Sequence, residues 1–279
     1  NISLRLPQQP NSYVISRVGS YYCLQNGTTG LLDGYSGDAS QIFSWAHGNL
    51  TNGGQIFWKD GDYNITNTLE VTNSRISVVG EGKSTRLFSE QPISILRLNS
   101  YRWHVSNLWI DGADRSLSGQ IGVEVLSGHH DCTLRDLYIT RIGDTCIKKT
   151  GYAHGWIIID NVFCYDYYNM GVSWNKEGVR IYHSIFRGID HANYGVYIEG
   201  LGNLACQIHD TGVYDHNVAG IYFYNWNQTI YPLAYSSVVA DCSILDNGGD
   251  GIRIEKADGI LISDSRIINN NRQTTNYHG

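Results

Sequence analysis

Charged and tyrosine side chains recur at one position of a short sequence motif that repeats along the chain. The position is occupied in turn by Arg97, Glu124, Lys148, Ser173, Tyr197, Tyr222 and Arg253. Glu124 beside Lys148 could be a base poised by a cation, although an ordinary surface ion pair is the more frequent outcome. Arg253 adds a further cation to the same row. Glu124, Lys148 and Arg253 are therefore the candidates for catalysis.

Aromatic residues gather toward the end of the same row. Tyr197 and Tyr222 occupy it on successive repeats, and Tyr224 and Trp226 follow closely. Rings in such a series could form a platform on which sugar rings stack. The alternative is a tyrosine ladder that only stabilises a sheet. These four residues are the candidate carbohydrate-binding set.

A second group of polar residues lies at comparable turn positions of successive repeats: Asp144, Asp166, Asp190-His191 and Asp215-His216. Carboxylate and imidazole pairs could bind a divalent ion or exchange protons, but polar turn residues without such a role are more common. The six cysteines show no C-x-x-C spacing, and we expect most to be small core residues rather than disulfide partners. We therefore expect no metal site and no cofactor, with a bound Ca²⁺ as the one alternative left open.

The elements that must position these side chains follow from the repeat itself. Successive copies of the repeated motif start at Gly122, Cys146, Gly171, Gly195, Gly220 and Gly251, which are 24, 25, 24, 25 and 31 residues apart. Each interval offers short runs with period-2 alternation, broken by Gly, Asn and Asp, and no amphipathic helical pattern. A repeat of this length with strands this short predicts one coil of a parallel β-helix.

Two apolar columns are predicted to point into the core. Within each column, residues of successive coils lie roughly 4.8 Å apart. The first is Val105, Leu134, Ile158, Ile181, Ile208, Val239 and Ile262, and the second is Ile110, Ile139, Phe163, Phe186, Val213, Ile244 and Ile267. A polar column between them is predicted to be the corner where the strand bends, because short side-chain oxygens can bond neighbouring backbone N–H groups there. Its members are Asn107, Asp136, Asp160, His183, Asp210, Asp241 and Asp264.

The N-terminal part differs from the repeats. Residues 1–37 alternate weakly and break up around Pro7, Pro10 and several glycines, so we expect an extended arm and loops. Asp38-Ala-Ser-Gln41 is a capping box that predicts a short helix ending near Gly48, of the kind that plugs the open end of a β-helix. The predicted organisation is an arm over residues 1–37 and an all-β, single-stranded right-handed parallel β-helix over residues 38–279.

The region after this helix resembles a known family. Asp38-Ala with its helix, Gly53-Gly54-Gln-Ile, Gly61-Asp-Tyr-Asn-Ile and Val78-Val-Gly-Glu-Gly are similar, in that order, to the N-terminal cap and first coil of pectate-lyase-like right-handed parallel β-helix proteins. The resemblance covers about residues 37–270 and implies the fold. It also implies that a sugar groove, if present, lies on the sheet that carries Glu124 and Tyr197.

The resemblance does not select one activity, because that superfamily includes lyases, hydrolases, epimerases, tailspikes and non-catalytic surface proteins. The Asp-Asp and Gly-His-Gly signatures of polygalacturonase-type hydrolases are absent, and Arg253-Ile-Glu255 only partly matches their Arg-x-Lys. The epimerase Asp-Pro-His motif and the Arg-rich signature of calcium-dependent pectate lyases are absent as well.

Composition favours an extracellular or cell-surface protein. The net charge is −6 without a basic run, which argues against nucleic acid as a partner, and no apolar run is long enough for a membrane span. The chain begins with Asn rather than Met, which suggests a processed mature form. Five N-x-Ser/Thr sequons mark candidate glycosylation sites at Asn1, Asn26, Asn49, Asn64 and Asn227.

The leading hypothesis at this point is a glycosylated structural protein that assembles with copies of itself. Asn276-Tyr-His-Gly279 resembles Asn193-Tyr-Gly195, the start of a coil, so we expect an open C-terminal end that contacts the N-terminal arm of another copy as a filament or surface layer. Two alternatives compete with it. One is a polysaccharide lyase or glycoside hydrolase acting on an acidic glycan, and the other is a non-catalytic glycan-binding module.

Overall fold

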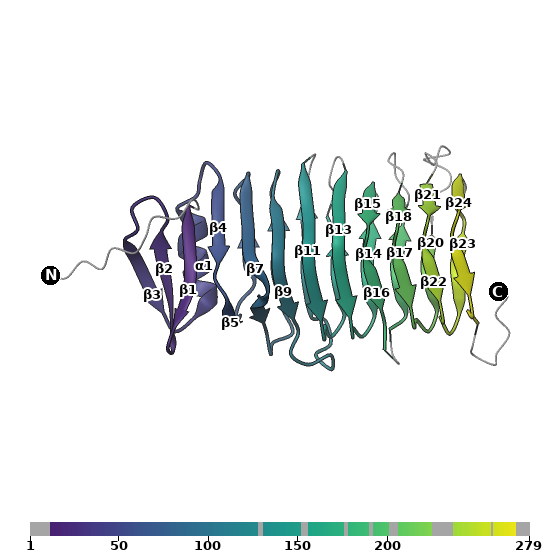
Figure 1. Cartoon of the computed structure of the whole chain (residues 1–279), viewed down its shortest axis with the longest axis horizontal. Coiled ribbons are helices and arrows are strands. Elements are labelled where there is room, and N and C mark those ends of the chain that lie inside the picture. The colour runs from purple at the N-terminus through teal and green to yellow at the C-terminus, as the bar shows by residue number, and fades with distance from the viewer. Residues whose placement is uncertain are drawn as a thin grey trace.

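The protein is a straight rod of stacked coils (Figure 1). The computed structural model describes residues 12–127, 131–151, 156–175, 178–189, 192–200, 206–224, 237–257 and 259–271. Successive coils pair through parallel strands, and the coils follow one another along the rod in sequence order. The predicted all-β parallel β-helix is therefore confirmed.

One face of the rod is an eight-stranded parallel sheet. Its strands are β6 (Leu69–Val71), β8 (Ser94–Asn99), β10 (Ile121–Ser127), β12 (Thr145–Lys149), β14 (Met170–Asn175), β17 (Tyr194–Glu199), β20 (Ala219–Tyr224) and β23 (Asp250–Glu255). Each strand pairs in parallel with the corresponding strand of the next coil.

The rest of each coil belongs to a larger, bent sheet. In its first coils the strands are β4 (Gly54–Trp58), β5 (Gly61–Asn64), β7 (Ile76–Phe88), β9 (His104–Asp111), β11 (Cys132–Thr140) and β13 (Ile157–Tyr165). Later coils divide the same path at the corner into β15 (Val179–Tyr182) and β16 (Ile185–Arg187), β18 (Gln207–His209) and β19 (Gly212–Tyr214), β21 (Ser237–Ala240) and β22 (Ser243–Leu245), and β24 (Ile260–Ser263) and β25 (Arg266–Ile268).

The N-terminal end is closed by the predicted helix. Helix α1 (Ala39–Gly48) begins at Asp38, whose carboxylate accepts a hydrogen bond of 2.9 Å from the backbone N–H of Ser40. Its buried face includes Ile42 and Phe43, and the Phe43 ring stacks on Trp58 of β4. The helix therefore covers the apolar end of the first coil, as Figure 1 shows.

Residues 13–36 contain more regular structure than an arm with loops. Strands β1 (Tyr13–Val18), β2 (Tyr21–Asn26) and β3 (Leu32–Ser36) form an antiparallel meander, and β1 also pairs in parallel with β4. The meander was missed because its alternation is weak and interrupted by glycines at each turn. In the described part of the chain, antiparallel pairing is confined to these strands.

The inward columns hold with one local correction. Leu134 aligns with Ile159, and Ile139 aligns with Cys164, so the prediction of Ile158 and Phe163 as core residues was wrong by one position. Three consecutive isoleucines at 157–159 make the register ambiguous from sequence, and a one-residue slip moves every side chain of a strand to its other face. The remaining members of both columns align as predicted.

The predicted corner is confirmed by its backbone. Asn107, Asp136, His183, Asp210, Asp241 and Asp264 all have φ between 48° and 56°. In the slipped coil this role falls to Asn161, with φ of 53°, and not to Asp160. Asn and Asp tolerate this left-handed conformation better than other residues with a Cβ atom, which explains their recurrence at the bend.

A chain of polar side chains runs inside the C-terminal coils. The buried His216 lies between the hydroxyl of Tyr167 and the side chain of Asn247, and Asn247 continues to Asn270. Because the amide oxygen of Asn247 faces Nδ1, that nitrogen donates and Nε2 accepts from Tyr167. Burial lowers the pKa of His216 to about 4, although the hydrogen bond with Asn247 acts in the opposite direction. The imidazole is neutral in this position.

This lowered pKa predicts acid sensitivity that originates at His216. The unfolded chain takes up the proton near pH 6.5 and the folded chain only near pH 4, so the stabilisation is complete above 6.5 and is lost as the pH falls toward 4. The loss can reach about 3 kcal/mol. Urea unfolding at pH 7 and pH 4.5 should show a larger loss for the wild type than for His216→Gln. Equal losses in both proteins would contradict this origin.

No helix in the described part of the chain is long and apolar enough to cross a membrane. None of the six cysteines is bonded to another in this structure, and all but the half-buried Cys23 lie in the interior. The expectation that most cysteines are core residues is thus confirmed.

Candidate functional site

The predicted row of charged and tyrosine residues lies on the outward face of the eight-stranded sheet. Strand pairing aligns Glu70, Arg97, Glu124, Lys148, Ser173, Tyr197, Tyr222 and Arg253, one from each coil. We call this set the outward row. Neighbouring members are about 4.8 Å apart, the distance between paired strands. The row therefore offers one side chain per coil to a ligand that lies along the rod.

Glu124 is firmly bound by its neighbours. It accepts hydrogen bonds from the hydroxyl of Ser94 at 2.7 Å and from Nε of Arg97 at 2.8 Å, and its side chain is only 12% exposed. Burial raises the pKa of Glu124, but the hydrogen bonds from Ser94 and Arg97 outweigh it and hold the pKa below its ordinary value. Glu124 is therefore an ionised anchor for Arg97, which also binds Glu70 at 2.7 Å.

Lys148 does not take part in the predicted ion pair with Glu124. Its ammonium group lies 3.6 Å from a carboxylate oxygen of Asp144, and its side chain is 34% exposed. Asp144 is itself oriented by the side-chain amide of Asn169, which donates to it at 2.9 Å. The pairing partner was missed because Asp144 lies in the turn before β12 rather than in the row. Lys148 thus presents its ammonium group to solvent on the outward face of the eight-stranded sheet.

Ser173 makes a low point in the outward row. It separates Lys148 on one side from Tyr197 on the other, and the two flanking residues belong to strands about 10 Å apart. A serine side chain is much shorter than either neighbour. A ligand group lying over Ser173 could therefore reach an ammonium group and a phenol at the same time. We call Lys148, Ser173 and Tyr197 the notch.

Tyr222 is the centre of an aromatic cluster rather than an open platform. It is 8% exposed, its hydroxyl donates to Glu255 at 2.7 Å, and Tyr194 stacks on its ring at a centroid distance of 5.6 Å. The guanidinium of Arg253 lies 5.1 Å from the centre of the same ring and also binds Glu255. Neighbouring side chains consequently cover most of the surface of Tyr222 and Arg253 that could otherwise contact a ligand.

Tyr197 and Tyr224 lie half-buried beside Tyr222, at ring distances of 5.3 and 6.0 Å. Burial raises the pKa of Tyr197 to about 12, so its phenol is protonated at physiological pH. Trp226 lies outside the described residues. Tyr194 was missed because strict alternation would place it on the same inward face as Val196, whereas its ring lies 5.3 Å from that of Tyr197.

The polar turn residues that the structure describes have other partners. Asp166 accepts from Arg115 at 2.7 Å, and Asp215 accepts from Arg187 at 2.9 Å. His216 points into the core, and Asp190 and His191 lie outside the described residues. Among the residues that the structure describes, no cluster of three or more His, Cys, Asp or Glu could hold a metal ion.

Three of the predicted glycosylation sites can be placed. Asn49 follows α1 and Asn64 ends β5, and both are exposed. The half-buried side chain of Asn26 is occupied by Asp33 and by two backbone N–H groups of its own turn. Asn1 and Asn227 lie outside the described residues.

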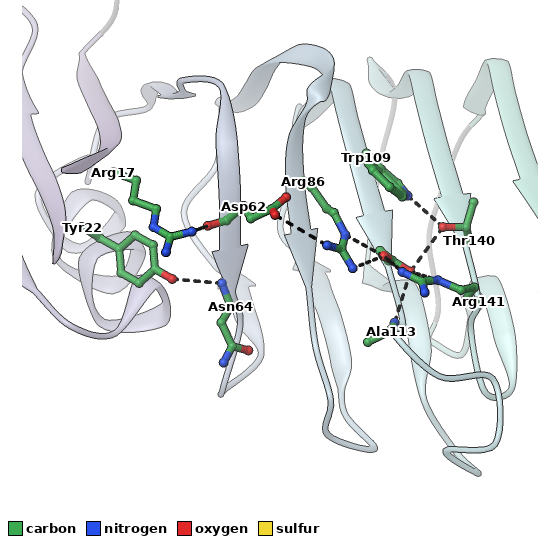
Figure 2. A network of polar contacts seen from close by, with 10 residues as sticks. Arg17, Tyr22, Asp62, Asn64, Arg86, Trp109, Ala113, Thr140 and Arg141 are labelled. Carbon is green, nitrogen blue, oxygen red and sulfur yellow. Dashed lines mark hydrogen bonds and ion pairs between the residues drawn. The ribbon is translucent and has the colours of Figure 1, made fainter. Parts of the chain in front are cut away.

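A second polar network lies on the other sheet, where the side chains of Arg86, Thr140 and Arg141 converge (Figure 2). Their common partner is Asp111, which joins three coils. This carboxylate is fully buried and accepts from Arg86 at 2.6 Å, from Arg141, from Thr140 and from the backbone of Ala113. Arg86 continues to Asp62 at 3.7 Å. Both oxygens of Asp111 are saturated with donors, so this network is a structural tie and not a second reactive site.

No family model and no curated protein sequence matches the chain. Solved structures do. The A-module of mannuronan C-5 epimerase AlgE6 from Azotobacter vinelandii superposes with a TM-score of 0.60 at 15% identity over 84% of this chain and 73% of that one. The Agl-KA catalytic domain gives 0.59 at 14% identity over 83% and 45%. The chain therefore has the right-handed parallel β-helix fold of the pectate-lyase-like type.

The tie at Asp111 can be tested by stability. Asp111→Asn removes the charge that two guanidinium groups share, and because both arginines keep some contact with water we expect a loss of about 1–3 kcal/mol in the free energy of unfolding. Asp62→Asn is the matched control, since Asp62 is 53% exposed and its contact is longer; its effect should stay below about 0.5 kcal/mol. Urea denaturation measures both, and similar losses would refute the assignment.

Proposed function

We propose that this protein binds a linear acidic polysaccharide along the outward row and acts on it as a carbohydrate-active enzyme. The observation that carries the proposal is the notch, where Lys148 and Tyr197 flank the short Ser173 on an exposed, regularly spaced sheet. The likeness to the mannuronan C-5 epimerase module supports the proposal at the level of fold. The anchored carboxylates and the tyrosine cluster on either side extend the same surface along the rod.

The chemistry available at the notch favours lyase- or epimerase-type proton abstraction over hydrolysis. Glycoside hydrolysis ordinarily needs one protonated and one ionised carboxyl group on opposite sides of the bond. Glu124 is a poor proton donor, because its pKa is lowered and its oxygens are bonded. The ammonium of Lys148 can instead stabilise the charge that develops on a uronate carboxylate when the adjacent C–H bond breaks. The carboxylate of Asp144, which lies 3.6 Å from the ammonium of Lys148, can accept the proton that leaves the carbon atom. The protonated Tyr197 can give its proton to a leaving oxygen, which completes the elimination.

A non-catalytic glycan-binding module is the second candidate. It is favoured by the extent to which Glu124, Tyr222 and Arg253 are already engaged with neighbouring side chains. In that case Tyr194, Tyr197 and Tyr224 supply stacking surface, and Lys148 supplies charge attraction without a chemical step. Both candidates use the outward row and differ only in turnover.

An extracellular or surface location with glycans at the exposed Asn49 and Asn64 fits either candidate and is proposed with them. Head-to-tail assembly of copies stays a prediction. Of the segments that it would involve, residues 1–11 of the predicted arm over residues 1–37 and residues 272–279 lie outside the described residues. Sedimentation of the purified protein over a wide concentration range tests it, and a constant monomeric mass would count against it.

Turnover is tested with a panel of uronan polysaccharides, by ultraviolet absorbance of unsaturated ends and by NMR of the product uronates. Lys148→Ala and Tyr197→Phe should each lower the rate by 10²-fold or more, because each removes charge stabilisation or proton transfer at the reacting sugar. Arg135→Gln on the other sheet is the control and should keep full activity. If no substrate is turned over, or if both notch variants remain fully active, the enzymatic proposal fails.

Binding is tested separately by affinity electrophoresis in gels that contain the same polysaccharides. Tyr197→Ala combined with Tyr224→Ala should weaken retention at least tenfold, because both half-buried rings leave the surface. Tyr222→Phe removes only the hydroxyl that binds Glu255, so it should change retention less than threefold. Retention that is lost in Tyr222→Phe but kept in the double variant would place the ligand elsewhere.

A further inference from the structure

The eight-stranded sheet contains a column of residues that lies close to the opposite wall of the rod. Strand pairing aligns Gly122, Cys146, Gly171, Gly195, Gly220 and Gly251. A Cβ atom added at Gly122 would lie 2.9 Å from Cγ2 of Ile139, and one added at Gly220 would lie 2.8 Å from Cγ2 of Ile244. The carbonyl oxygen of the next coil lies closer still, at 2.6 Å for Gly122 and 2.7 Å for Gly220. Glycine fits this column because the facing core residue and this carbonyl together leave little room for a side chain.

Cys146 is the exception in the glycine column, and the residue that faces it is also an exception. The facing column contains Ile139, Cys164, Phe186, Val213, Ile244 and Ile267 in register. Cys146 therefore opposes Cys164, just as Gly122 opposes Ile139 within the preceding coil. Both side chains are fully buried, and burial, followed by a hydrogen bond with the Cys164 thiol, raises the pKa of Cys146.

The distance across this column is too short for two carbon atoms in contact, but it is close to the distance between Cβ and the partner Sγ in a disulfide. Across the column, the facing γ or δ atoms lie 2.3 to 2.9 Å from an added Cβ. In a disulfide each Cβ lies about 3 Å from the partner sulfur, because the sulfurs are bonded at about 2.05 Å. The spacing between the two walls in the neighbouring coils is therefore close to that of a bonded cysteine pair.

We propose that Cys146 and Cys164 form a disulfide that joins the two sheets across the interior of one coil. Cys146 lies on β12, two residues before Lys148, so the bond fixes the strand that carries one side of the notch. The bond is a property of the fold and holds whether or not the outward row is catalytic.

The bond forms by thiol–disulfide exchange during folding. The two thiols lose two protons and two electrons, the Sγ–Sγ bond forms, and an external disulfide such as oxidised glutathione is reduced to two thiols. Burial raises the pKa of Cys146 well above its ordinary value, which makes the folded thiol inert. Oxidation therefore has to precede the closure of the coil, as happens in an oxidising compartment.

The experiment is oxidative refolding of the full chain with a mixture of reduced and oxidised glutathione, followed by alkylation in denaturant and tryptic mass spectrometry. Cleavage after Arg141, Lys148, Lys149 and Lys176 places the two cysteines in separate peptides, residues 142–148 and 150–176. We expect these peptides to be linked, with four of the six cysteines alkylated. Six alkylated cysteines, or a link to any other cysteine, would overturn the proposal.

Variants separate the bond from general effects of oxidation. Cys164→Ser should show five alkylated cysteines and no link, and Cys206→Ser should keep the link and show three. Dithiothreitol should lower the thermal midpoint of the wild type and of Cys206→Ser by roughly 5–10 °C, because a loop of some twenty residues is released. It should leave Cys164→Ser unchanged. The same fall in all three proteins would show that another group responds.

Discussion

In-register hydrogen bonding between successive coils is the constraint on which the rest of this structure depends. Parallel strands pair position by position, so a residue that faces inward in one coil lies directly above an inward residue of the next. The apolar columns of the core and the outward row on the eight-stranded sheet are two results of the same alignment. A ligand surface of regular spacing therefore needs no special loop to build it, because the backbone ladder supplies the order.

Some polar side chains have all their hydrogen-bonding capacity taken up by neighbouring residues, and these are structural. Others keep part of it available for a ligand. Asp111 and Glu124 are both buried carboxylates on an outer face, and each is fixed by arginine and hydroxyl donors. Lys148 has a looser contact with Asp144, and Tyr197 keeps a protonated hydroxyl at a half-buried position. Partner geometry therefore identifies the notch more selectively than residue type does, since all four residues are of types used in catalysis.

Much of this arrangement was predictable from the sequence, and the errors have physical causes. The outward row from Arg97 to Arg253 and the Asx corner follow from spacing alone. The register at Ile157-Ile158-Ile159 was wrong because all three residues suit the core, so hydrophobicity does not select a face. Tyr194, and the pairing of Asp144 with Lys148, were missed because both residues lie where a turn enters a strand and alternation fails. The partner of Glu124 depends on side-chain reach between coils, which a one-dimensional pattern does not contain.

The near-constant size of the coils also bears on how such a chain can change in evolution. A duplicated stretch of two dozen residues would enter the stack as one more layer, with its core residues already opposite matching neighbours and its glycine already opposite a bulky partner. The Asp111 tie and the cysteine-bearing coil both precede β14, so a layer inserted among the later coils would disturb neither. Rod length and the length of the outward row would then vary together, by gene duplication, without redesign of either sheet.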